Sequence, residues 1–201
     1  MNEELERGET PEAEGDGAPG QETLKPKRST FIELYEWLEC SVHGIILVLL
    51  IFTFVARTSM VSGSSMVPTL HEGDMLITSR LFYTPKQGDI VVATMPFRNN
   101  EPIVKRVIAL GGQEVNIDFT EGTVYVDGVE LEEHYVNSKT NRSYDIEFPI
   151  VVPEGELFLL GDNRNASQDS RSSEIGTVDE RYIFGKVVYR VFPFEQMGKV
   201  E

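Results

Sequence analysis

Cysteine is almost absent from this chain of 201 residues, in which Cys40 is the single example. One cysteine excludes an intramolecular disulfide framework. Cys40 stands at the start of an apolar run, where we expect it to act as a small hydrophobic residue. Lipidation of its thiol is the alternative that this position leaves open.

Basic residues are also scarce. The chain has 18 Lys and Arg but 33 Asp and Glu, which gives a net charge of −15. Proteins that bind nucleic acid need clustered basic residues, so this balance argues against such a partner. Residues 1–30 carry eight acids and four bases and are rich in Pro, Gly and Glu. We expect them to form a disordered, acidic cytoplasmic tail without a function of its own.

Charged residues are missing from one stretch, the seventeen residues 40–56. This length is about the lower limit for a helix that crosses the hydrocarbon core of a bilayer. Tyr35 and Trp37 precede the stretch, and three basic residues lie within 25–28. Aromatic residues anchor helices at the membrane interface, and basic residues stay on the cytoplasmic side. We therefore predict a transmembrane anchor region at 35–57 with the amino terminus in the cytoplasm.

Two alternatives to an anchor are a cleavable signal peptide and a buried core helix. A cleavable signal peptide needs small residues at −1 and −3 of its cleavage site, whereas the end of the run places Phe54 at −3. A helix that is apolar on all faces suits lipid better than a protein core. The sequence thus predicts a single-pass protein of the cell membrane, whose domain 58–195 is extracytoplasmic.

Helical periodicity is absent after Thr58, where short apolar runs alternate with turn residues. Such runs are typical of antiparallel strands. They cover residues 75–78, 89–93, 103–110, 114–117, 123–126, 156–160 and 186–191. The pair Asp127-Gly128 within 124–131 predicts a tight hairpin. We expect a mainly β protein in which one transmembrane helix precedes an antiparallel, barrel-like catalytic domain, with the polar residues 132–147 as a loop or insert.

Histidine-based catalysis has little support. The three histidines, His43, His71 and His134, lie in the apolar run, in a turn and in a polar stretch. A Gly-x-Ser-x-Gly motif is missing, and so is a cluster of residues with the spacing of metal ligands. The sequence therefore predicts neither a catalytic metal nor a cofactor.

Lysine is the better candidate for a base, because Lys105 lies in the apolar run 103–110. Burial disfavours the ammonium form and lowers the pKa of a lysine. A neutral amine can then take the proton of a serine hydroxyl, as in Ser-Lys variants of the catalytic triad. The serine would be Ser65, just beyond the predicted span. The alternative is that Lys105 and Arg106 form a solvated strand edge.

A third segment, 161–171, is too polar for a core strand and dense in paired charges. Within this loop, Asp162 and Asp169 can pair with Arg164 or Arg171. Such ion pairs would make the loop rigid. The hydroxyl of Ser167 can then reach the lysine amine. The alternative is an ordinary polar surface loop.

Together these segments resemble bacterial type I signal peptidase (leader peptidase), in particular its small, single-anchor, Gram-positive-like type. The matching stretches occur in the family's order after a membrane anchor, and the resemblance extends over about residues 35–192. They are 62–70 (SGSSMVPTL), 88–92 (GDIVV), 105–108 (KRVI) and 161–171 (GDNRNASQDSR).

This resemblance implies a role for each matching residue. Ser65 would be the nucleophile, Lys105 the general base, and Ser167 the residue that orients the lysine. Gly63 and Met66 would lie next to the oxyanion site, where Gly63 replaces the serine found in some members. The pair 165–166 (Asn-Ala) replaces a more usual Asp-Asn. The structural ion pairs of the loop would come from Asp162, Arg164, Asp169 and Arg171.

The implied function is removal of N-terminal signal peptides from exported preproteins by a membrane-bound serine endopeptidase. Its substrate would be an extended peptide that pairs with the strands beside Ser65 and Lys105 and carries small residues at −1 and −3. Its partners would be such preproteins and the lipid bilayer, and we expect a monomer. The main alternative is an inactive module of the same fold that binds signal sequences or assembles pilin-like partners. A self-cleaving regulator would need a DNA-binding head, which residues 1–30 cannot supply.

Overall fold

The computed structural model describes residues 30–54, 57–95 and 101–200. The chain divides into two units, Met1–His43 and Gly44–Glu201, which are considered separately. The predicted acidic tail lies outside the described residues, apart from its last position.

One long helix, α1 (Thr30–Phe54), begins near the amino terminus. The side chains of residues 30–50 are all exposed. Over the described ranges, no helix meets the length and apolar character needed to cross a membrane. The helix α1 covers residues 35–54 of the predicted anchor region 35–57, and its transmembrane character is not confirmed.

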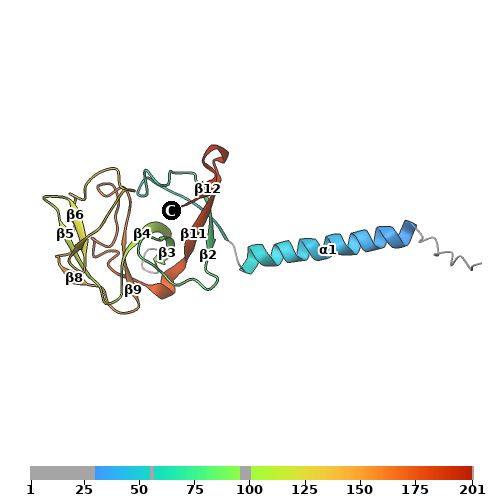
Figure 1. Ribbon diagram of the computed structural model, residues 1–201, viewed down its shortest axis with the longest axis horizontal. Coiled ribbons are helices and arrows are strands. Elements are labelled where there is room, and N and C mark those ends of the chain that lie inside the picture. The colour runs from blue at the N-terminus through green and yellow to red at the C-terminus, as the bar shows by residue number, and fades with distance from the viewer. Residues whose placement is uncertain (1–29, 55–56, 96–100, 201) are drawn as a thin grey trace, which may run out of the picture. The chain divides into compact units, whose positions relative to one another are not determined.

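A large antiparallel sheet forms most of the domain that follows (Figure 1). Its strands, in spatial order, are β1 (Arg57–Met60), β2 (Met75–Ser79), β11 (Ile183–Phe192), β3 (Ile90–Met95), β4 (Glu101–Leu110), β9 (Glu156–Leu160) and β10 (Val178–Asp179). An additional strand, β12 (Gly198–Lys199), pairs with β11.

A smaller antiparallel sheet has the order β7 (Val129–Glu130), β6 (Thr123–Val126), β5 (Glu114–Asp118) and β8 (Ile150–Val151). Figure 1 shows β5, β6 and β8 at one end of the domain, β2, β11 and β12 at the other, and β3 and β4 between them. Short 3₁₀ helices occupy Glu180–Tyr182 and Phe194–Gln196.

All seven strands predicted from short apolar runs are present. In β5 the burial of side chains alternates strictly, as expected for a strand with one face on a core. The hairpin between β6 and β7 is confirmed, with Val126 opposite Val129. Its turn residues, Asp127 and Gly128, have φ angles of 52° and 77°, which is the left-handed pair that this turn requires.

The structure departs from the prediction in one respect, because the described sheets do not close into a barrel. Among the described residues, the strand order of each sheet has two ends and neither sheet closes on itself. The strands missed at the sequence level, apart from β1, have only two residues, too few to show a period of two. The domain is therefore built from two open antiparallel sheets.

The large sheet supplies the rigid frame of the candidate site. In β4, all residues from Lys105 to Ala109 are buried. One core cluster packs Met66 and Leu70, from the loop after β1, against Leu76 and Ile90. Full burial of a side chain such as Leu70 contributes about 1.5–3 kcal/mol. The core therefore holds the serine-containing loop against the sheet.

Candidate active site

Ser65 lies in the loop between β1 and β2, on a short turn held at both ends. Its neighbour Met66 is only 1% exposed, and the Leu70 N–H donates to the Met66 carbonyl oxygen at 2.9 Å. Gly63 has a φ angle of +80°, a conformation that costs side-chain-bearing residues free energy. Ser65 itself is half-buried. Core packing on one side and a left-handed glycine on the other thus orient the serine.

Lys105 comes from the middle of β4, where it lies opposite Val91 of β3. It is only 4% exposed. Its Nζ donates to Ser65 Oγ at 2.8 Å and to the Val104 carbonyl oxygen at 3.1 Å. The structure therefore brings together the two residues that the sequence singles out as nucleophile and base.

A cleft of about 520 Å³ lies in front of this pair. Its walls include residues 58–62 of β1 and the following loop, residues 101–105 of β4, Met66 and the hydroxyl-bearing Ser65. Residues 101–106 of β4 pair with β3 on one side. On its other side, β4 pairs with β9 only from residue 106 onward. β1 stands at the end of the sheet order described. Both strands consequently turn an edge without a described strand partner toward the cleft.

The loop 161–171 is hydrogen-bonded to the backbone of Ser64 and Ser65. The Asn163 N–H donates to the Ser65 carbonyl oxygen at 3.0 Å, and its Nδ2 donates to the Ser64 carbonyl oxygen at 3.1 Å. Gly161 also lies close, because a Cβ added there would be 2.2 Å from Ser167 Oγ and 2.5 Å from the Ser65 oxygen. Only glycine fits at this position, and it lets Ser167 approach the backbone of Ser65.

Ser167 is fully buried. Its hydroxyl has no hydrogen-bond partner among the residues that the structure describes. The expected hydrogen bond to the Lys105 amine is therefore not made, although the crowding at Gly161 places Ser167 close to Ser65. A buried hydroxyl without a partner costs free energy.

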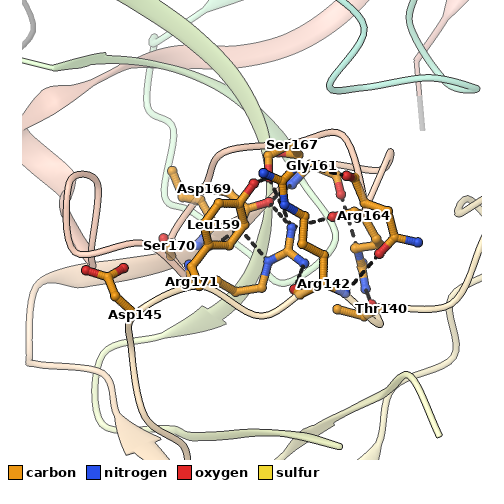
Figure 2. A network of polar contacts seen from close by, with 12 residues as sticks. Thr140, Arg142, Asp145, Leu159, Gly161, Arg164, Ser167, Asp169, Ser170 and Arg171 are labelled. Atoms are coloured by element: carbon orange, nitrogen blue, oxygen red, sulfur yellow. Dashed lines mark hydrogen bonds and ion pairs between the residues drawn. The ribbon is translucent and has the colours of Figure 1, made fainter. Parts of the chain in front are cut away.

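The ion pairs of this loop differ in part from those expected. Asp169 pairs with Arg171, as anticipated, through bonds of 2.8 and 2.9 Å to its two carboxylate oxygens. Asp162 instead binds Arg106, and Arg164 binds Glu133. Figure 2 shows how Arg164 and Arg171 lie across the loop close to Ser167. Two of the three pairs thus tie the loop to other segments rather than to itself.

Three residues that the sequence analysis did not assign to the site complete this network, namely Arg106, Glu133 and Tyr135. Tyr135 packs its ring against two guanidinium groups, with the centroid 3.8 Å from Cζ of Arg106 and 5.9 Å from Cζ of Arg164. Such cation–π contacts are attractive. Burial, aided by the charge of Glu133, raises the pKa of Tyr135 to about 12, so the phenol stays neutral. In the sequence, the only indication of these residues was that Arg106 directly follows Lys105.

Known proteins of similar sequence belong to one family. The model of the family "Signal peptidase, peptidase S26" matches residues 34–192. Signal peptidase I of Bacillus licheniformis is 34% identical over 178 residues, which cover 84% of this chain and 94% of that protein. Signal peptidase I T of Bacillus subtilis (strain 168) is 34% identical over 195 residues, 90% of this chain and 95% of that protein. With this extent of similarity, the chain belongs to the signal peptidase family, peptidase S26.

Proposed function

We propose that the protein removes signal peptides from exported preproteins, with Ser65 as the nucleophile and Lys105 as the general base. The hydrogen bond of 2.8 Å between Lys105 Nζ and Ser65 Oγ is the observation that carries this proposal. Lys105 is 4% exposed, and burial favours the neutral form of an amine. A neutral amine at this distance is placed to accept the proton of the serine hydroxyl.

In acylation, Ser65 Oγ attacks the scissile carbonyl carbon while its proton moves to the amine of Lys105. The tetrahedral intermediate collapses when the Lys105 ammonium gives that proton to the leaving amine, which releases the mature chain. The signal peptide remains as an ester on Ser65. In deacylation, the neutral amine takes a proton from water while the water oxygen attacks the ester carbonyl carbon. The bond between that carbon and Ser65 Oγ then breaks, the Lys105 ammonium returns the proton to Ser65 Oγ, and the signal peptide leaves with a free carboxyl group.

The oxyanion of the intermediate needs donors close to Ser65. We assign one donor to the backbone N–H of Ser65, as in other acyl-transfer sites. Gly63 brings no side chain, and its φ of +80° disfavours a serine in its place. The buried Met66 keeps this corner of the cleft apolar, which strengthens the electrostatic interactions within it. A second donor therefore has to come from the backbone or from water.

The substrate would bind as an extended peptide in the cleft between β1 and the first half of β4. Peptides of this kind add a strand to a free sheet edge and place alternate side chains in pockets. Small residues at −1 and −3 fit a site built in this way. The buried pairs that surround Ser167, formed by Asp162, Arg164, Asp169 and Arg171 with their partners, would hold the orienting serine in place.

We also propose that residues 40–56 anchor the protein in the cell membrane, with the catalytic domain extracytoplasmic. The support is an uncharged run of seventeen residues, 40–56, in which the side chains at 40–50 are all exposed. Lipid would cover such a surface at little cost.

Cleavage of a preprotein with an Ala-x-Ala site by the full chain in detergent tests the proposal. Ser65→Ala and Lys105→Ala are expected to abolish cleavage. The matched controls are Ser64→Ala and Lys86→Ala, both at exposed positions, which are expected to retain it. Full activity in either Ser65→Ala or Lys105→Ala would show that the dyad is misassigned. Binding of the preprotein without cleavage by the wild type would favour an inactive module.

A further inference from the structure

The polar segment 132–147, which the structure describes completely, forms neither helix nor strand. It is nevertheless bonded to the loop that holds Ser167. Asn165 Oδ1 accepts from the N–H groups of Asn141 and Arg142 at 3.2 and 3.0 Å. Its Nδ2 donates to the Lys139 carbonyl oxygen at 3.0 Å. An aspartate at 165 could not make this last bond, so the asparagine found here matches the segment opposite it.

Further bonds fasten the segment along its length. Arg164 Nη1 donates to Thr140 Oγ1 at 2.9 Å, and Arg171 Nη1 donates to the Arg142 carbonyl oxygen at 2.8 Å. Figure 2 shows Thr140 and Arg142 on one side of these two guanidinium groups, with Ser167 near their other side. The segment is therefore joined to the loop 161–171 by several hydrogen bonds.

Tyr144 is the residue of this segment that binds Ser167. Its hydroxyl donates to the Ser167 carbonyl oxygen at 2.8 Å. Its half-buried ring lies close to two guanidinium groups, with the centroid 4.8 Å from Cζ of Arg142 and 5.4 Å from Cζ of Arg171. These contacts hold the ring, so the hydroxyl points at Ser167 with little freedom to turn away.

The backbone of Ser167 is consequently held on its carbonyl side. Tyr144 and Arg171 Nη2 both donate to its carbonyl oxygen, at 2.8 and 3.2 Å. The side chain is fully buried and lies against Gly161, and its hydroxyl has no partner among the described residues. With the backbone held, one torsion, χ1, decides where that hydroxyl points. A shift of the backbone would move the hydroxyl directly.

We infer that Tyr144 is a positioning residue of the active site and that it acts through Ser167. The inference rests on the proposed function, in which Ser167 orients the Lys105 amine. Loss of the Tyr144 hydroxyl frees the Ser167 carbonyl on one side while the ring contacts to Arg142 and Arg171 remain. The substrate cleft is lined by other residues, so the effect falls on the chemical step rather than on substrate binding.

Tyr144→Phe in the full chain in detergent is the variant that tests this role. We expect kcat to fall about fivefold, in keeping with about 1 kcal/mol for one net hydrogen bond, and KM to stay unchanged. The matched control is Tyr125→Phe, because Tyr125 lies on β6 of the small sheet. This variant is expected to have the wild-type values of kcat and KM. Melting temperatures of both variants show whether the fold is retained.

A double-mutant cycle with Ser167→Ala separates positioning from general stability. If Tyr144 acts through the Ser167 hydroxyl, Tyr144→Phe has no further effect on kcat once Ser167 is alanine. Additive losses, a rise in KM, or a wild-type kcat for Tyr144→Phe would contradict the inference. The proposed function fails separately, if Ser65→Ala still cleaves or if Ser167→Ala is fully active.

Discussion

Arg106 binds Asp162 through two parallel hydrogen bonds, from Nε at 2.9 Å and from Nη2 at 2.7 Å. Both side chains are almost completely buried, at 3% and 0% exposure. Arg106 directly follows Lys105 in β4, and Asp162 directly precedes Asn163, which binds the Ser65 backbone. The pair thus connects the strand of the proposed base to the loop behind the proposed nucleophile.

Asp162→Asn is expected to lower the free energy of unfolding by about 3–5 kcal/mol, because it leaves the Arg106 guanidinium buried without its counter-charge. The matched control is Asp179→Asn, since Nε and Nη2 of Arg181 likewise donate to the two carboxylate oxygens of Asp179, and Arg181 is 83% exposed. Water screens exposed pairs of this kind, so they contribute little to stability. Urea unfolding of both variants measures the difference, and equal losses would mean that burial of the Arg106 pair is unimportant.

Gly161→Ala is expected to reduce cleavage about 100-fold, because displacements of about 1 Å at a catalytic site have effects of that size. The new methyl group would overlap Ser167 Oγ and the Ser65 carbonyl oxygen. Gly198→Ala is the control, since a Cβ there meets nothing within 4 Å. The measurement is the cleavage rate of each variant, and the melting temperatures of both variants show whether they are folded. A fully active Gly161→Ala would show that this close approach is not needed.

Asp145, in the segment 132–147, is expected to stabilise the fold only above acidic pH. The Ser173 hydroxyl and N–H both donate to its carboxylate, which lowers the pKa of Asp145. Because the folded-state pKa is the lower one, the stabilisation is complete above the unfolded-state pKa and is lost as pH falls through the folded-state value. The melting-temperature difference between wild type and Asp145→Asn should therefore vanish on acidification. A difference that grows at low pH would contradict this.

Much of the fold follows from local patterns in the sequence. Short apolar runs between turn residues predicted seven of the eight described strands that have four or more residues, and Asp127-Gly128 predicted the hairpin turn. Strands of two residues carry no such pattern. Closure of a sheet depends on the pairing of distant strands, which explains why the barrel-like arrangement was predicted wrongly.

The site was predictable where family resemblance supplied long-range information. Ser65 and Lys105 are 40 residues apart, and their contact depends on the register that places Lys105 opposite Val91. The partners of Asp162 and Arg164 come from β4 and from the segment 132–147, which charge patterning within the loop could not indicate. Tyr144 was missed for the same reason, because its contact with Ser167 is tertiary.

The dependence of kcat/KM on pH tests the central claim, that Lys105 is the base for Ser65, most directly. Only the neutral amine can accept the serine proton, so kcat/KM should rise as pH increases through the alkaline range in which a lysine loses its proton. Measurements on the full chain in detergent, with one signal-peptide substrate throughout, provide this profile. A plateau that begins at about pH 5 would contradict the account, because a base already neutral there would not be this lysine.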